Sequence, residues 1–562
     1  RAEVMESDHF EATRLVHPAL AAGASSQVSW HLVQKQAVET SGEQVEVTLR
    51  LVAPDLNVAF ERTLSLPTLE PSSPYKRTFL SPTDGSTQYY GVREPIAVVE
   101  GDTYGLALSL HGAQVQGIGQ AQSYAQKDWA YVVAATNRRP FGFDWEAWGR
   151  RDGLEVLAHA KASFSIEPGR VHVTGHSMGG HGAWQFGTLM AGLFGVTGPS
   201  AGWSSFYTYG GTAKPSGAFA AARASSDTML YLSNLTNKPV YVIHGDADDN
   251  VPISESYALI EAASPYTTPE LHVEPGAGHW WNGDLSAGVD CVDWPPLFDL
   301  MEATTFDPIA LDFVYQTPSP SVNATHSYVT INSCHTSYEP CALESTLNTD
   351  NEVVLNTDNV RGLTLRGAEL VARGVERVRW NGVEVPVLEV DIPLGEQSGK
   401  TPEVYGPFNQ VFERPFCLIY PDNGPSAYKE YAAYLLTAWS IQGNGAGCAM
   451  PYSRVTDALR AARNMVYLGV AKESIPAAAT LPVSWDTNTL TIKDETHAAA
   501  AMLFVFPEGD RLGAAMVATV TFEYLLFWHQ PFSSRAVMPD YFMWTANNGG
   551  VVAGMAGGDW SY

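Results

Sequence analysis

A serine between glycines is the first candidate for chemistry in this chain. Ser177 lies at the centre of GHSMG, residues 175–179, which fits the pattern G-x-S-x-G. Small residues two positions on either side of the serine allow a tight turn from a strand into a helix, and this turn exposes the hydroxyl. Apolar, strand-like residues precede the motif at 171–174, and helix-compatible residues follow it at 183–186. This context predicts that Ser177 is a nucleophile.

Two later loops offer the partners that a serine nucleophile needs. The stretch VYVIHGDADDNVP places Asp246, Asp248 and Asp249 directly after an apolar run, and the stretch PGAGHWW places His279 after another. A carboxylate in the first loop can accept the Nδ1–H of a histidine and stabilise the imidazolium. The chain order Ser, Asp, His is that of the α/β-hydrolases. We expect His279 to be the base, and the residues alone leave the acid open among the three aspartates.

Backbone amide groups are expected to stabilise the oxyanion. The N–H of Met178 follows the nucleophile directly, and LSLHGA ends an earlier strand at Ala113. The backbone just after such a His-Gly pair supplies the second donor in hydrolases of this kind. We therefore predict Met178 and Ala113 as the oxyanion hole, with Gly112 keeping the turn open. An ordinary strand-end turn is the alternative for the second position.

Aromatic side chains are close to these loops in sequence. They are Trp203, Phe206, Tyr207, Tyr209, Trp280 and Trp281. We predict that Trp203 and Trp280 line an apolar substrate pocket, although core packing explains the aromatic residues equally well. The nearby cations are Arg138, Arg139, Arg150 and Arg151. Because Asp144 and Glu146 can neutralise them, a clamp for a substrate carboxylate is weakly supported, and a neutral acyl or aromatic ester is favoured.

The elements that must position these residues follow an α/β pattern between residues 86 and 315. Short apolar runs alternate there with helix-compatible segments, which predicts a parallel sheet covered by helices. Residues 1–85 alternate with period two and predict a small β domain. After the joint QTPSPS, residues 322–395 predict a β-sandwich, and residues 403–562 a second α/β unit. The predicted fold class is α/β, with a parallel-sheet core, flanking β domains and a C-terminal α/β unit.

The three motifs together resemble the prolyl oligopeptidase-like superfamily of α/β-hydrolases. GHSMGG resembles its nucleophile turn, HGDADDNVP its acid segment and GAGHWW its histidine loop. In the family the first aspartate of the paired aspartates is the triad member, so the resemblance selects Asp248. The resemblance covers roughly residues 86–315. The family's oligopeptidases carry a β-propeller, and no blade-like repeat occurs in this chain, so esterases with the same core are the closer analogy.

Composition narrows the set of partners. The 33 Lys and Arg against 60 Asp and Glu give a net charge of −27, which argues against nucleic acids and anionic membrane surfaces. No apolar run is long enough for a transmembrane helix.

The stretches LGEQSGKT and GNGAGC lack glycines that phosphate-binding and dinucleotide-binding loops require, and no metal-ligand spacing occurs. We therefore expect no cofactor and a small-molecule or polymer-derived ester as substrate. The oligomeric state stays open.

The five cysteines suggest an oxidising compartment. Cys334 and Cys341 are close enough for a small disulfide loop, and Cys417 and Cys448 can pair, which leaves Cys291 free. The alternative is five buried thiols in a cytosolic protein. Asn-x-Thr sequons begin at residues 234 and 323. The sequence predicts a secreted or periplasmic protein whose signal peptide is absent or already removed.

The predicted function is hydrolysis of carboxylic esters through an acyl-enzyme formed on Ser177. One rival is an exported serine peptidase that trims short peptides. A rival from another class is a carbohydrate- or surface-binding protein with an idle hydrolase core. Labelling with a fluorophosphonate separates the enzyme from the idle core, because only an activated serine reacts.

Overall fold

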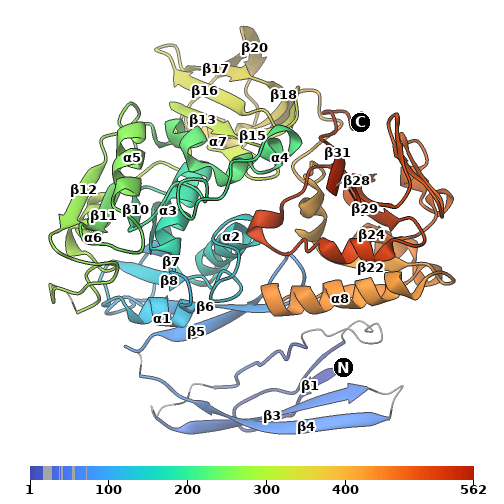
Figure 1. The fold of residues 1–562 in the computed structure, drawn as a ribbon. Coiled ribbons are helices and arrows are strands. Elements are labelled where there is room, and N and C mark those ends of the chain that lie inside the picture. The colour runs from blue at the N-terminus through green and yellow to red at the C-terminus, as the bar shows by residue number, and fades with distance from the viewer. Residues whose placement is uncertain are drawn as a thin grey trace.

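The computed structural model describes residues 1–16, 28–36, 38, 42–53, 57–70, 72–285, 287–547 and 549–562. Within these ranges the chain forms four units around separate sheets (Figure 1). No helix in the described part of the chain is long and apolar enough to cross a bilayer.

An eight-stranded sheet forms the centre of the molecule. Its strand order is β12-β11-β10-β9-β7-β8-β6-β5, and the pairs from β8 through β12 are parallel. Its strands are β5 (Tyr75–Leu80), β6 (Thr87–Arg93), β7 (Tyr104–Leu110), β8 (Ala130–Ala134), β9 (Ile166–His176), β10 (Thr197–Ser200), β11 (Tyr241–Gly245) and β12 (Glu270–Glu274). Its helices are α1 (Gly117–Gln122), α2 (Ala147–Ser163), α3 (Met178–Leu189), α4 (Gly217–Ala222), α5 (Ser254–Ala263) and α6 (Pro295–Ala303).

The continuous apolar runs of the sequence explain this arrangement. Strands such as β7 and β8 are buried along their whole length because helices cover both faces of a parallel sheet. The α/β-hydrolase fold predicted for this part of the chain is confirmed.

Three further units surround this sheet. The N-terminal sheet contains β1 (Ala2–Val4), β2 (Thr13–Leu15), β3 (Gln44–Ala53) and β4 (Val58–Pro67). One sheet of the β-sandwich contains β13 (Phe313–Thr317), β16 (Cys341–Leu347), β17 (Glu352–Asp358), β19 (Arg377–Trp380) and β20 (Val383–Pro386). The other contains β14 (Thr325–His326), β15 (Val329–Cys334), β18 (Val360–Arg366) and β21 (Asp391–Gly395), and α7 (Gly367–Ala372) follows β18.

The C-terminal unit is a mixed sheet in the order β23-β22-β24-β29-β28-β30-β31. Its strands are β22 (Phe416–Tyr420), β23 (Cys448–Pro451), β24 (Asn464–Leu468), β28 (Ala500–Glu508), β29 (Arg511–Ala518), β30 (Tyr541–Thr545) and β31 (Gly549–Gly554). The helices are α8 (Ser426–Gly443) and α9 (Asp457–Ala462), and β25 (Val483–Trp485), β26 (Leu490–Ile492) and β27 (Glu495–His497) form a small separate sheet.

Two strands lie in other sheets than the predicted boundaries imply. Strand β5 falls within the predicted N-terminal domain 1–85, but it pairs with β6 at the edge of the eight-stranded sheet. Strand β13 begins within the predicted range 86–315, but it pairs with β16 of the sandwich. Both are short, alternating strands whose partners are set by long-range packing, which local periodicity does not encode.

The C-terminal unit packs directly on the hydrolase unit. Trp148 of α2 contacts Trp439 of α8, with ring centroids 5.6 Å apart, and its Nε1–H donates to the carbonyl of Phe412. Phe143 and Trp148 belong to the same apolar core as the first face of the C-terminal sheet. The two α/β units are therefore joined by a continuous core at α2.

The cysteines pair as the sequence predicts. Cys334 is bonded to Cys341 and Cys417 to Cys448, with Cα separations of 6.3 and 4.7 Å, while Cys291 is a buried free thiol. The first disulfide closes the turn between β15 and β16, and the second joins the neighbouring parallel strands β22 and β23.

Candidate active site

The turn at Ser177 connects β9 to α3 without an intervening loop. Ser177 has φ 61° and ψ −120°, a conformation that non-glycine residues rarely adopt. A Cβ on Gly179 would lie 1.8 Å from the carbonyl oxygen of Leu110, and one on Gly175 would lie 2.4 Å from the carbonyl oxygen of Gly179. Gly179 is therefore required by the close approach of backbone from β7, and Gly175 by that of both β7 and the start of α3.

The structure brings the three predicted triad residues together. The Nε2 atom of His279 lies 2.8 Å from Oγ of Ser177, and its Nδ1 lies 2.7 Å from Oδ2 of Asp248. Nδ1–H donates to the carboxylate, so Nε2 accepts the hydroxyl proton of Ser177. This is the arrangement that a serine nucleophile needs, with a base at the hydroxyl and a carboxylate that orients the base.

Backbone and side-chain donors hold the Asp248 carboxylate. Its Oδ1 accepts the N–H groups of Asn250 and Val251, each at 2.9 Å. Burial raises the pKa of this carboxyl, but the hydrogen bonds from His279 and the two amides lower it by more, so its pKa lies below the ordinary value. Asp248 is therefore ionised where His279 needs a negative partner.

The other two aspartates of this loop, Asp246 and Asp249, do not contact His279. Oδ1 of Asp246 accepts the N–H of Gly276 at 2.6 Å and ties the acid loop to the histidine loop. Asp249 is exposed. The contact with His279 thus separates Asp248 from its neighbours, which the spacing of the residues could not do.

Sequence reasoning missed a second histidine behind the acid. His244, at the end of β11, lies with Nε2 2.9 Å from the carbonyl of Val251 and 3.3 Å from Oδ2 of Asp248, and its Nδ1 lies 2.8 Å from Oγ of Ser256. Burial lowers the pKa of His244, so the ring is neutral with Nε2 as the donor. The spacing His244-x-x-x-Asp248 was the available signal, but a histidine in a strand reads as a core residue.

His176, the residue before the nucleophile, packs on the catalytic candidates. Its ring centroid lies 4.8 Å from that of His279 and 5.3 Å from that of Trp280. Its Nδ1 lies 2.9 Å from Oγ of Ser200, which donates to the carbonyl of Cys291 at 2.6 Å. Burial and the adjacent His279 lower the pKa of His176 to about 3, so a neutral ring supports the base without repelling its protonated form.

The segments that carry the two predicted oxyanion donors lie beside the nucleophile. Met178 is the first residue of α3, where a helix leaves its amide without an intrahelical acceptor. The turn that carries Ala113 lies against Ser177, because a Cβ on Gly112 would be 3.4 Å from Cβ and 3.9 Å from Oγ of that serine. Their role in binding an oxyanion stays a prediction.

The aromatic residues divide between core and surface. Trp203 is 3% exposed and stacks on His181, one helical turn after Ser177, with ring centroids 5.1 Å apart. Trp280 is 53% exposed beside His176. Trp281 packs on Trp294 in a different cluster of the core. Core packing therefore accounts for Trp203, and the pocket role of Trp203 and Trp280 stays a prediction.

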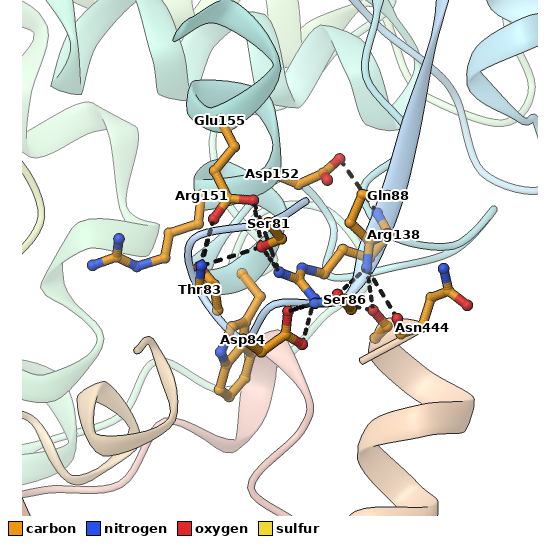
Figure 2. A network of polar contacts seen from close by, with 12 residues as sticks. Ser81, Thr83, Asp84, Ser86, Gln88, Arg138, Arg151, Asp152, Glu155 and Asn444 are labelled. Atoms are coloured by element: carbon orange, nitrogen blue, oxygen red, sulfur yellow. Dashed lines mark hydrogen bonds and ion pairs between the residues drawn. The ribbon is translucent and has the colours of Figure 1, made fainter. Parts of the chain in front are cut away.

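The first two arginines of the stretch NRRPFGFDWEAWGRR point to the C-terminal unit. Figure 2 shows Arg138 between two loops and the end of α8, where it pairs with Asp84 at 3.1 Å and donates to Oγ of Ser81 at 2.7 Å and the carbonyl of Gly443 at 3.2 Å. Arg139 donates to the carbonyl of Ser440. These two side chains join the units.

A family model matches the segment that contains the three triad residues. Residues 136–288, which include Ser177, Asp248 and His279, match the model of the prolyl oligopeptidase family. The resemblance predicted from the motifs is confirmed for this segment. This family match and the hydrogen bonds among Ser177, His279 and Asp248 support a serine hydrolase.

Individual relatives are distant. An uncharacterized secreted protein of Arthroderma benhamiae is 26% identical over 163 residues, which are 26% of this chain and 17% of the relative. The chain thus spans less than a fifth of the length of that relative. Among solved structures, a thermostable esterase is 15% identical, with a TM-score of 0.31 and coverage of 54% of this chain and 90% of that chain. The acylaminoacyl peptidase of Pyrococcus horikoshii is 13% identical, with a TM-score of 0.31 and coverage of 44% and 45%. Similarities of this size carry no information about the substrate.

Proposed function

We propose that this protein hydrolyses carboxylic esters through an acyl-enzyme on Ser177. The observation that carries the proposal is the continuous path from Ser177 through His279 to Asp248, with both hydrogen bonds shorter than 3 Å. A serine hydroxyl becomes a useful nucleophile at neutral pH when a positioned base removes its proton during attack.

The reaction proceeds in two matching halves. Oγ of Ser177 attacks the carbonyl carbon while Nε2 of His279 takes the hydroxyl proton, and Asp248 stabilises the imidazolium. The amides of Met178 and Ala113 stabilise the negative oxygen of the tetrahedral intermediate. His279 then protonates the departing alkoxide, and the alcohol leaves. A water molecule, deprotonated by the same imidazole, attacks the acyl-enzyme and releases the acid and Ser177.

The charge environment favours an ester over a peptide. Peptidases that trim chain ends need charged groups to bind a terminus, but Arg138 and Arg139 bond to the interface with α8 and Arg151 pairs with Glu413 at 2.9 Å. Next to the base, His176 is neutral and Trp280 is exposed. An alkoxide is also a better leaving group than an amine. The two disulfides further support export of this enzyme.

A side-by-side comparison of substrates tests the proposal. We expect kcat/KM on nitrophenyl and aryl esters to exceed that on dipeptide nitroanilides by at least about a hundredfold, and we expect both activities to be lost in Ser177→Ala. A preference for an aminoacyl or prolyl amide would replace the esterase with a peptidase. Failure of a fluorophosphonate to label Ser177 would reject both enzymes.

A further inference from the structure

A small cavity lies where the hydrolase unit, the β-sandwich and the C-terminal unit meet. Its volume is about 130 Å³, and it is lined by α2, α4 and the segments around residues 318–322 and 407–413. None of the three triad residues lines it. The volume is close to that of cavities that hold one small organic molecule or a few waters.

Arg150 of α2 is the notable group in this cavity. The residue is only 7% exposed, and its guanidinium makes two long contacts, from Nη1 to Oε1 of Gln185 at 3.4 Å and from Nη2 to Oγ of Ser225 at 3.5 Å. A guanidinium has five N–H donors, and both contacts are at the upper limit for a hydrogen bond. Within the described residues, no carboxylate forms an ion pair with it.

The neighbouring carboxylates are committed to other donors. Glu413, which lines the cavity, accepts from Nε of Arg151 at 2.9 Å. Glu146 is not among the lining residues; it accepts from Oγ of Ser226 at 2.5 Å, and its Oε1 lies 3.2 Å from Nε2 of His181. Burial lowers the pKa of Arg150, while Glu413 and Glu146 raise it by less. A buried positive charge therefore remains without a direct counter-charge, which is costly for a folded protein.

We propose that this cavity, here called the Arg150 cavity, binds a small monocarboxylate such as acetate or propionate. A carboxylate matches the fork of the guanidinium with two parallel hydrogen bonds. A bound carboxylate would supply the direct partner that Arg150 lacks, because Glu413 is paired with Arg151 and Glu146 is bonded to Ser226 and His181. A dianion would place a second charge near Glu413. The hydroxyl of Ser225 is within reach of the same ligand.

This site would tie three units together through one ligand. Ser225 follows α4 and Arg150 belongs to α2, and the lining also includes Ser319 from the segment before β14 and Asn409 of the C-terminal unit. A ligand that binds the assembled cavity and not the unfolded chain raises the unfolding temperature.

Thermal unfolding at constant ionic strength tests the proposal directly. We expect 100 mM sodium acetate to raise the unfolding temperature of the intact protein by about 2 °C more than sodium chloride does. Arg150→Gln should abolish this difference, and Arg150→Lys should retain less than half of it. The matched control is Arg139→Gln, which removes an arginine of the same stretch outside the cavity and should keep the full acetate response.

Several outcomes would overturn the proposal. Equal responses to acetate and chloride in the unmodified protein would show that acetate does not bind, and an acetate response that survives in Arg150→Gln would show that acetate acts elsewhere. Because sulfate stabilises folded proteins without binding a site, only the part of each response that is lost in Arg150→Gln is compared, and a larger such part for sulfate than for acetate would reject the monocarboxylate. If Arg150→Gln does not fold, Ala222→Leu fills the same cavity and keeps the arginine, and it must also lose the acetate response.

Discussion

The two α/β units of this molecule start from the same local plan and differ where a strand meets a helix. In the hydrolase unit, β9 passes into α3 through one residue, Ser177. In the C-terminal unit, β22 passes into α8 through residues 421–425, a loop with a proline at each end. The first junction holds a hydroxyl at the edge of the sheet against a base. The second simply reverses the chain.

Asp422 of the second junction bonds to Ser453, which lies in the short turn after the neighbouring strand β23. Asp422 accepts the backbone N–H of Ser453 at 2.9 Å and also its hydroxyl. This serine has a carboxylate partner, but no imidazole lies between them to remove its proton. The comparison shows that the carboxyl end of a parallel strand can carry polar side chains in both units. Only the direct strand-to-helix junction at Ser177, with a histidine beside the hydroxyl, makes a serine a candidate nucleophile.

The largest expected effect is on turnover, which should depend on the serine of the first junction and not on the polar pair at the second. Ser177→Ala should lower turnover by about six orders of magnitude, because residues of such a triad act as one unit. Ser453→Ala, which removes the hydroxyl bonded to Asp422 of the C-terminal junction, should leave turnover within about twofold of the unmodified enzyme, because it removes only an exposed hydrogen bond. Steady-state kinetics and fluorophosphonate labelling measure both. A Ser177→Ala protein that keeps most of its activity would refute the mechanism.

The next effect concerns the acid. Asp248→Asn should lower kcat by about four orders of magnitude, because the amide leaves the imidazole in the wrong tautomer while the packing is kept. Asp246→Asn is the control in the same loop and should cost less than about tenfold in kcat, since its contact is with the backbone of Gly276. Kinetics on one aryl ester compares the two.

The same carboxylate makes a pH prediction. The folded-state pKa of Asp248 is below its ordinary value, so its contribution to stability is complete above the unfolded pKa, near 3.8. That contribution is lost as the pH falls through the lower folded pKa. The difference in unfolding temperature between the unmodified protein and Asp248→Asn should therefore be constant from pH 8 to about 5 and shrink below about pH 4. A difference that grows on acidification would contradict this sign.

A smaller effect tests the glycines of the two junctions. Gly179→Ala forces a Cβ into backbone of β7 and should destabilise the hydrolase unit by at least about 3 kcal/mol. Gly424→Ala in the loop before α8 meets only the side chain of Pro421, at 3.0 Å, and should cost under about 1 kcal/mol. Chemical denaturation followed by tryptophan fluorescence measures both. Equal costs would remove the special packing assigned to the first junction.

The smallest expected difference is between the disulfides. The chain-entropy estimate assigns about 2.5 kcal/mol to the short loop of Cys334 and Cys341 and about 3.7 kcal/mol to the longer loop of Cys417 and Cys448. Paired serine replacements should therefore lower the stability of the C-terminal unit more than that of the sandwich. Non-reducing peptide maps should recover each pair as a linked fragment. Free alkylation of all four cysteines in the native protein would favour a reducing compartment and remove the main support for export.

The motifs predicted most of the site because the catalytic chemistry restricts both residue type and order. Ser177 and His279 each stand in a short glycine-rich stretch after an apolar run, and the structure joins them by a hydrogen bond. The residues did not decide among three neighbouring aspartates, since all of them follow the same strand. Contact with the imidazole singles out Asp248, and His244 behind it had no motif of its own.

Local sequence patterns also could not predict which sheet an edge strand joins or which groups the arginines contact. An alternating strand such as β5 satisfies either a small β domain or the edge of a larger sheet, and pairing with β6 decides it. From the sequence, Arg138 is a cation near the nucleophile that Asp144 or Glu146 can neutralise, yet the folded chain buries it between Asp84 and the end of α8 (Figure 2). One of its partners, the carbonyl of Gly443, lies 305 residues further along the chain, beyond the reach of local patterns.

The sequence by itself therefore determined the α/β succession, the nucleophile turn and the order of the catalytic residues. These features depend on backbone conformation, local apolar periodicity and residue chemistry, all of which act over a few neighbouring residues. The family resemblance had already selected Asp248, and its contact with His279 agrees with that choice. Tertiary structure alone decided which sheet receives β5 and that Arg150 is buried without a carboxylate paired to it. Those outcomes depend on long-range packing and on the burial of charge, which exist only in the folded chain.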